Sequence, residues 1–210
     1  MHGCHSILEL ACGTGLLARH FLTGGYDYLG IDLHEEMLAI ARQTAPGGQF
    51  QQGDMRHFES PENKEWDAVL VAGRSFYHLA SNTDVLECLA SVQRALRSAG
   101  LLVLEAFDAA QTFTNFRNHG HRTIFDGDDY YKRKVRFERL FDTGWTERAR
   151  ERYTVKKNGI ITKFRNKVVI RAFLPDEIRL LLRLGGFETL SYACLKEAPS
   201  IFVVVAQKKE

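Results

Sequence analysis

Residues 7–21, ILELACGTGLLARHF, constrain the fold of this chain more than any other stretch. An apolar run that carries one acid breaks into Cys-Gly-Thr-Gly and resumes at once with the spacing of a helix. Glycines that lack a Cβ let a ligand approach the main chain, and the carboxyl end of a parallel strand is the usual binding crevice. The stretch therefore predicts a small ligand at a strand-to-helix turn, although a purely structural junction remains an alternative.

The first hundred residues alternate short apolar runs with amphipathic ones, which is typical of βαβ units and a parallel sheet covered on both faces. We therefore predict a Rossmann-like, doubly wound α/β sheet. The strands are expected at residues 6–12, 26–33, 48–54, 66–73 and 99–107, and the helices at 15–22, 35–43 and 84–96.

From about residue 112 the pattern changes to period-2 alternation, which indicates antiparallel strands. Turn signals stand at Asp126-Gly127, Thr143-Gly144 and Asn158-Gly159. A helix opened by Pro175 and two strands at 187–195 and 200–207 then close the chain. We expect one domain, 1–210, with residues 112–172 as an antiparallel β insertion that serves the substrate or a dimer.

Length and composition exclude several classes of protein. A chain of 210 residues with 45% hydrophobic and 26% charged residues reads as a globular domain. It has neither an apolar run of about 20 residues nor a basic segment followed by an apolar core at its start. Its 4 cysteines are scattered and its 8 histidines show no ligand spacing. We therefore expect a cytoplasmic protein with no membrane segment and no metal site.

The charge is unevenly distributed. Residues 117–171 hold 16 of the 28 Lys and Arg but only 7 of the 26 Asp and Glu. Such a basic insertion is open to three interpretations: solvated faces of the strands, a site for a phosphate-bearing substrate, or an RNA surface with interleaved aromatic residues. A homodimer contact through the edge of its sheet is a further possibility.

Two acids indicate which ligand the glycine turn holds. Asp32 ends the second expected strand, 17 residues after Gly15, where a carboxylate can accept the hydroxyls of a ribose. Asp54 follows the third strand at the same sheet edge. A helix cap for Asp32 and a turn for Asp54 are the alternatives, but together the two acids favour adenosine. Glu9, just before the turn, would repel a pyrophosphate and suits a ligand that carries an ammonium group.

Five ordered motifs, ELACGTG, Asp32 with Met37, GDM, WDAVLVAGRSFYHL and AGLLVLEAF, resemble class I S-adenosylmethionine-dependent methyltransferases. The resemblance covers residues 6–107 and, more loosely, the closing helix and strands. It implies a seven-stranded sheet whose last strand is antiparallel, with S-adenosylmethionine as cofactor. The expected cofactor contacts are Glu9, Ala11, Gly13, Gly15, Asp32, Leu33, Met37, Asp54, Met55, Gly73 and Ser75.

Within that superfamily the chain is similar to small-molecule N-methyltransferases that act on amino sugars. The sulfonium donor is already activated, so the protein mainly aligns and desolvates the reactants. We expect His78 or Tyr77 to take or relay the proton of an amine acceptor, with a histidine in the insertion as the alternative. A non-catalytic cofactor-binding scaffold and an RNA methyltransferase are the alternatives, and the absence of an Asn-Pro-Pro motif makes nucleic acid the less favoured partner.

The family resemblance also implies helices ahead of the first strand, and these helices cover the cofactor. Here that strand is expected to begin at about residue 6. We therefore expect either a shortened site or closure by another segment or subunit.

Overall fold

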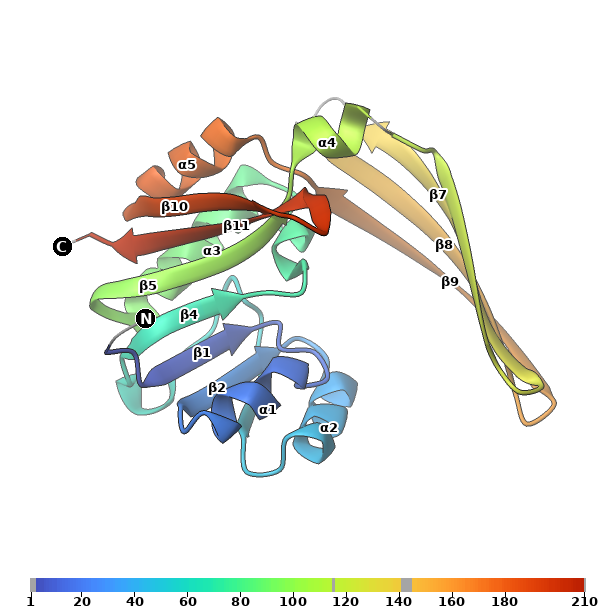
Figure 1. The fold of residues 1–210 in the computed structure, drawn as a ribbon, viewed down its shortest axis with the longest axis horizontal. Helices are drawn as coiled ribbons and strands as arrows, with labels where there is room; N and C mark the ends of the chain where they lie inside the picture. Colours follow the sequence, from blue (N-terminus) through green and yellow to red (C-terminus); the bar gives the residue numbers. More distant parts are fainter. Residues whose placement is uncertain (1–2, 115, 141–144, 210) are drawn as a thin grey trace.

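The computed structural model describes residues 3–114, 116–140 and 145–209. Its described strands form two separate sheets, one of seven strands and one of four. The four-stranded sheet extends away from the seven-stranded one, and helix α4 lies where the two adjoin (Figure 1). The molecule therefore has two differently built parts.

The seven-stranded sheet has the order β10-β11-β5-β4-β1-β2-β3. Strands β1 to β5 are parallel to one another, whereas β11 is antiparallel to both of its neighbours. This order confirms the predicted class I methyltransferase sheet. Its strands are β1 (Ser6–Leu10), β2 (Asp27–Asp32), β3 (Gln49–Gln52), β4 (Trp66–Val71), β5 (Leu96–Phe107), β10 (Phe187–Leu195) and β11 (Ala198–Lys208).

Helices cover both faces of this sheet because successive strand residues point to opposite sides. Leu8 and Leu10 face the larger core cluster, which α3 and α5 complete, while Ile7 faces a smaller cluster under α1. A Ser81–Asp84 capping box starts α3, and Pro175 opens α5 as expected. The helices are α1 (Leu16–Thr23), α2 (Glu35–Thr44), α3 (Asn82–Ala95), α4 (Ala109–Thr114) and α5 (Pro175–Leu184), with 3-10 turns η1 (Pro61–Asn63) and η2 (Ser75–His78).

The second sheet is an antiparallel meander of order β6-β7-β8-β9. Its strands are β6 (His119–Asp126), β7 (Asp129–Leu140), β8 (Thr146–Lys157) and β9 (Ile160–Arg171). Positive φ values at Gly127, Asn158 and Gly159 make the hairpin turns at two of the expected places. The expected turn at Thr143-Gly144 lies outside the described residues.

Some helix and strand boundaries in the structure differ from the expected ones. Strand β5 starts at Leu96, which pairs with Trp66, so α3 ends one residue earlier than its apolar pattern indicates. Residues 112–114 complete α4, and the first strand of the meander begins at His119. Within the described ranges no helix combines the length and apolar character needed to span a bilayer.

Candidate functional site

The turn after β1 has the backbone that its glycines predict. Ala11, Gly13 and Gly15 have φ values of 55°, 56° and 73°. A Cβ added at Gly15 would lie 3.0 Å from the Cβ of Ala41, so this glycine lets α2 pack closely. A Cβ added at Gly13 would meet nothing within 4 Å. The Gly13 main chain therefore borders open space, as a cradle for a ligand requires.

The Asp32 carboxylate joins this turn to the loop after β2 through hydrogen bonds. Its carboxylate is 7% exposed and accepts the Gly13 N–H at 2.8 Å through Oδ2 and the His34 N–H at 2.9 Å through Oδ1. The residue that caps α2 is His34, so Asp32 supports the entry to the helix without being its cap. Each carboxylate oxygen keeps a further lone pair for a ligand hydroxyl.

A cavity of about 430 Å³ lies where β1, β2 and β4 end. Its lining combines acidic, basic and apolar side chains, a mixture typical of a small-molecule site. Nine of the predicted site residues line it: Ala11, Gly13, Asp32, Leu33, Met37, Asp54, Met55, Ser75 and His78.

Apolar side chains are exposed at this cavity. Leu33 and Met37 are 55% and 42% exposed although both are large hydrophobic residues. Leu33 directly follows Asp32, and both side chains line the cavity. An exposed apolar surface beside a hydroxyl-binding carboxylate suits a ligand that joins a flat ring to a ribose.

Four predicted site residues do not line the cavity: Glu9, Gly15, Gly73 and Tyr77. Glu9 is 4% exposed, and its carboxylate accepts the Tyr28 hydroxyl at 2.6 Å. Burial raises the pKa of Glu9 to about 7, although the Tyr28 hydrogen bond favours the charged form. Glu9 is therefore buried in β1, bonded to the neighbouring strand β2, and is not exposed to a ligand in the cavity.

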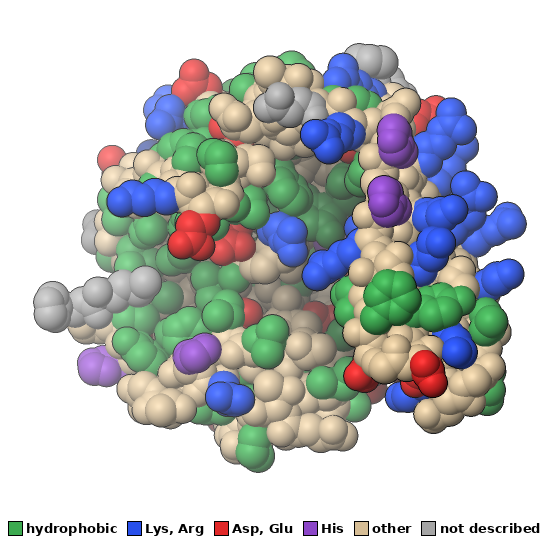
Figure 2. Space-filling view, turned by 45° about the vertical axis from the view of Figure 1, so that its right-hand side comes forward, with side chains coloured by type: hydrophobic (Ala, Val, Ile, Leu, Met, Phe, Trp, Pro, Cys, Tyr) green, Lys and Arg blue, Asp and Glu red, His purple; other side chains and the backbone are tan. Residues whose placement is uncertain are grey.

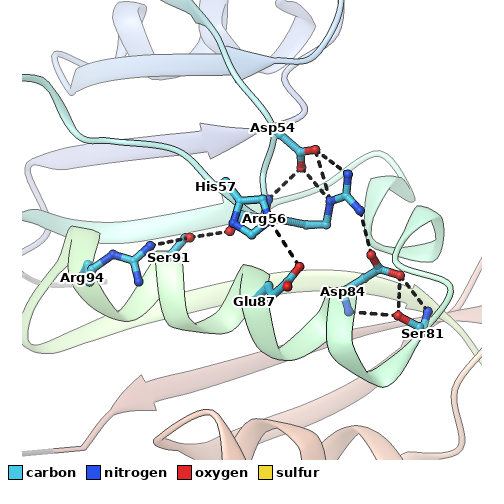
Figure 3. A network of polar contacts seen from close by, with 8 residues as sticks. All are labelled: Asp54, Arg56, His57, Ser81, Asp84, Glu87, Ser91 and Arg94. Carbon is cyan, nitrogen blue, oxygen red and sulfur yellow. Dashed lines mark hydrogen bonds and ion pairs between the residues drawn. The ribbon is translucent and has the colours of Figure 1, made fainter.

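Asp54 belongs to an ion-pair network that the sequence did not reveal (Figure 3). The Arg56 guanidinium bonds the Asp54 carboxylate at 2.6 Å and Asp84 at 2.8 Å. Hydrogen bonding from Arg56 holds the pKa of Asp54 below its usual range. Asp84 also closes the capping box of α3 with Ser81. The network joins the loop after β3 to the start of α3.

The loop after β4 brings His78 to the cavity. Its ring centroid lies 4.2 Å from that of Tyr77, which in turn lies 5.5 Å from Phe107 at the end of β5. Desolvation lowers the pKa of His78, against the pull of the Glu151 carboxylate, and burial raises the pKa of Tyr77. His78 is thus a neutral imidazole near neutral pH.

The second sheet packs against η2 through β9 and therefore faces the same crevice. Figure 2 shows this hollow between the two parts of the molecule, with Lys and Arg gathered on the outer side of the second sheet. On the inner face, Glu151 accepts hydrogen bonds from Arg133 at 2.8 Å, Tyr153 at 2.7 Å and Asn166 at 3.0 Å. The inner face is therefore polar and ordered where it meets η2.

Sequence reasoning missed four residues that line the cavity: His34, Arg56, Leu79 and Asp84. Arg56 stands two positions after Asp54, and the spacing of Ser81 and Asp84 is that of a capping box, so local signals existed for both. No three His, Cys, Asp or Glu side chains of the described residues come together as a metal site.

The fold and this cavity define an α/β protein with a candidate small-molecule site at the carboxyl edge of a doubly wound sheet. A methyltransferase domain model matches residues 7–100. Over 218 residues the chain is 31% identical to a glycine/sarcosine N-methyltransferase of Aphanothece halophytica, covering 99% of this chain and 77% of that protein. The chain belongs to the S-adenosylmethionine-dependent methyltransferases.

Two further similarities are informative. The chain is 33% identical over 110 residues to a dTDP-3-amino-3,4,6-trideoxy-alpha-D-glucopyranose N,N-dimethyltransferase of Streptomyces venezuelae, covering 52% of this chain. The chain spans 46% of that relative and 45% of a Bacillus subtilis (strain 168) relative, about half their length. The sugar N-methyltransferase KedS8 from Streptoalloteichus sp ATCC 53650 has the same fold, with a TM-score of 0.83, 22% identity and coverage of 99% and 81%.

Proposed function

We propose that this chain transfers a methyl group from S-adenosylmethionine to the nitrogen of a small-molecule amine. The observation that carries the proposal is the cavity in which Gly13, Asp32, Leu33 and Met37 come together beside His78. The relatives named N-methyltransferases support nitrogen as the atom methylated.

The residues present fit such a cofactor. Asp32 would hold the ribose, Leu33 and Met37 the adenine faces, and Asp54 with Met55 the adenine edge. The open main chain at Gly13 would contact the methionine end, with Gly15, Gly73 and the buried Glu9 shaping the loops behind it. Three aspartates and one arginine line the cavity, a balance that suits a cationic sulfonium better than a pyrophosphate.

Bound S-adenosylmethionine supplies a methyl group already activated on sulfur. What remains for the chain is to align the amine, exclude water and accept a proton. His78 is neutral near pH 7 because its pKa is lowered, so its imidazole can accept the proton of the amine. The Tyr77 ring contacts the His78 ring at a tilt of 35°, so Tyr77 would help to position the imidazole.

A methyl-transfer assay by mass spectrometry tests the proposal, with a dTDP-amino sugar, glycine and sarcosine as acceptors. His78→Asn is expected to lower kcat about 100-fold at pH 7 with little change in cofactor affinity. His121→Asn, on the outer face of the second sheet, serves as the matched control. If S-adenosylhomocysteine binds but no amine in the panel is methylated, the scaffold alternative is favoured.

An RNA methyltransferase is the second candidate, because one face of the second sheet is strongly basic. Along β7 and β8 the outward positions include Lys132, Lys134, Arg136, Arg150 and Arg152. RNA binding through this face would weaken steeply between low and moderate salt. Affinity that does not change with salt argues against RNA.

The same sheet has two free edges among its described strands, β6 and β9. Ile160 and Ile161 at the β9 edge are 70% and 54% exposed. We propose this edge as the contact of a homodimer. Light scattering of the chain and of Ile160→Glu tests it, since the dimer should dissociate in the variant.

The four free thiols support a cytoplasmic location, which fractionation of the source cells would test.

A further inference from the structure

Among the described residues that line the candidate cofactor cavity, Arg56 is the one Lys or Arg. Its guanidinium lies between the carboxylates of Asp54 and Asp84, at 2.6 and 2.8 Å (Figure 3). Both carboxylates line the cavity as well. Asp54 is the group that the proposed function assigns to the adenine edge, so the contacts of Arg56 with Asp54 bear directly on how the base is recognised.

Arg56 takes up most of the hydrogen-bonding capacity of the Asp54 carboxylate. Its Nη2 donates to Oδ2 at 2.6 Å, and its Nε lies 3.1 Å from both oxygens. The Arg56 main-chain N–H donates to Oδ1 at 2.9 Å. A carboxylate offers about four lone-pair positions, so these three donors leave about one for a ligand. Because the guanidinium is a planar fork, it fixes the plane of the carboxylate and therefore which position stays free.

Arg56 is itself held from the side away from Asp54. Asp84 accepts the Arg56 Nη1 through Oδ1, while its Oδ2 accepts the Ser81 N–H at 3.0 Å and the Ser81 hydroxyl at 2.6 Å. The Arg56 carbonyl accepts the hydroxyl of Ser91, a residue of α3 that is 1% exposed, at 2.6 Å. Main chain and side chain of Arg56 are thus both bonded to α3, which leaves the guanidinium little freedom to turn.

This arrangement keeps both acids charged. Hydrogen bonding from Arg56 lowers the pKa of Asp54. Desolvation opposes the charge of Asp84, but hydrogen bonds from Ser81 and Arg56 outweigh it and lower its pKa. An ionised carboxylate only accepts hydrogen bonds. The remaining position on Asp54 therefore suits an amino group of a base, whereas a keto oxygen in the same place would meet a second acceptor.

We propose that Arg56 is a positioning residue that sets the base specificity of this site. It orients the Asp54 carboxylate so that the remaining acceptor position takes the amino group of adenine and rejects a base with a keto oxygen there. The inference rests on the proposed function, because it concerns the base of the same cofactor. Arg56 acts through Asp54 and needs no contact of its own with the cofactor.

Calorimetric titrations of the full chain with S-adenosylhomocysteine and with S-inosylhomocysteine test the proposal. The second ligand carries a keto oxygen where adenine has its amino group, and the quantity measured is the ratio of the two dissociation constants. The parent chain should favour S-adenosylhomocysteine about 10- to 100-fold, the contribution of one hydrogen bond to a charged group. Arg56→Lys keeps the positive charge but loses the planar fork, so it should lower the preference to about threefold or less.

Arg94→Lys is the matched control. Arg94 donates to the Ser91 hydroxyl at 2.8 Å on the same helix, but it does not line the cavity. This variant should keep the preference of the parent chain. A loss of preference in Arg94→Lys equal to that in Arg56→Lys would overturn the proposal, because the effect would then belong to α3 in general.

A double-mutant cycle tests whether Arg56 acts through Asp54. Asp54→Ala should abolish the preference, and Arg56→Lys added to Asp54→Ala should change the ratio no further. If Arg56→Lys does not fold, Asp84→Asn replaces it in these titrations. That variant removes the outer carboxylate that holds the guanidinium, and it should lower the preference in the same direction.

An unchanged ratio in the folded Arg56→Lys or Asp84→Asn chain would overturn the proposal. Equal weakening of both ligands would also overturn it, because a purely structural role of Arg56 has that effect. The same holds for a parent chain that binds both ligands equally. A folded parent chain that binds neither ligand removes the proposed function itself, so the two failures are distinguishable.

Discussion

The two sheets of this chain are built on opposite principles. The seven-stranded sheet is buried on both faces, and side chains such as Leu8, Val69 and Phe202 are fully enclosed. In the second sheet Phe125, Ile160 and many charged side chains are exposed. The first sheet thus supplies most of the hydrophobic stability and a fixed edge, while the second supplies a wall whose polar groups remain available for binding.

Both sheets bury glutamates, and the pKa values of two of them, Glu9 and Glu151, shift in opposite directions. Glu9 in β1 has one hydrogen-bond donor, Tyr28, and burial raises its pKa to about 7. Desolvation opposes the charge of Glu151 in β8 as well, but donors from Tyr153, Arg133 and Asn166 outweigh it and lower its pKa. Burial alone therefore does not decide the charge of a carboxyl group; the number of donors does.

The largest contrast should appear when the same substitution is made in each sheet. Phe202→Ala removes a fully buried ring whose centroid lies 4.7 Å from that of the Tyr192 ring. This substitution should lower the free energy of unfolding by about 3–5 kcal/mol. Phe164→Ala removes a ring that is 48% exposed and stacks on Tyr153, at a cost of about 1 kcal/mol. Urea unfolding of both variants measures the difference. Equal losses would mean that the two sheets are not built differently.

Glu9→Gln should stabilise the chain at pH 8 by up to about 3 kcal/mol. The folded-state pKa of about 7 lies above the ordinary 4.5, so the folded chain holds the proton longer as the pH rises. The free energy of unfolding of the parent chain therefore falls between about pH 4.5 and 7. The variant avoids that loss because its amide carries no charge and can still accept the Tyr28 hydroxyl. At pH 4 the two proteins should unfold at the same urea concentration; a gain that is independent of pH would refute a buried, protonatable Glu9.

Glu151→Ala should destabilise the chain by about 2 kcal/mol at pH 8, because it leaves partly buried hydrogen-bond donors without an acceptor. Since the folded-state pKa is lowered, this contribution is present above the ordinary pKa and disappears as the pH falls through the folded value. Glu138→Ala, whose carboxylate is exposed on the outer face, is the control and should cost less than about 1 kcal/mol. Thermal unfolding at pH 8 and pH 3 gives both values, and equal costs for the two variants would contradict the network.

The smallest effect is expected at the glycine turn itself. Ala11 has a φ of 55°, in the left-handed region that strains a residue with a Cβ. Ala11→Gly should therefore stabilise the chain by about 0.5–1 kcal/mol. Thr14→Gly in the same loop is the comparison variant and offers no such relief. A destabilising Ala11→Gly, measured by urea unfolding, would show that the turn is not strained.

Local signals in the sequence predicted the parallel part of the first sheet, through strand-helix alternation. The antiparallel last strand and the nine residues that line one cavity followed from the family resemblance that the ordered motifs carry. These signals work because the carboxyl ends of parallel strands meet at one edge whatever the loops do.

The remaining features depend on contacts between distant segments. Arg56 bonds Asp84, 28 positions along the chain, and Tyr28 bonds Glu9 from the next strand. Which face of the second sheet points inward follows from its packing on η2, so periodicity alone could not distinguish Glu151 from the charged residues on the outer face. An alternating strand shows two faces without showing which of them is covered.

Calorimetric titration with S-adenosylhomocysteine tests the central claim most directly, on the parent chain, on Asp32→Ala and on the control Asp176→Ala. The Asp176 carboxylate is 96% exposed on α5, away from the cavity. Micromolar binding by the parent and the control, with at least about 100-fold weaker binding by Asp32→Ala, is the predicted result. Undiminished binding by a folded Asp32→Ala, or no binding by a folded parent chain, would contradict the assignment of this cavity to the cofactor.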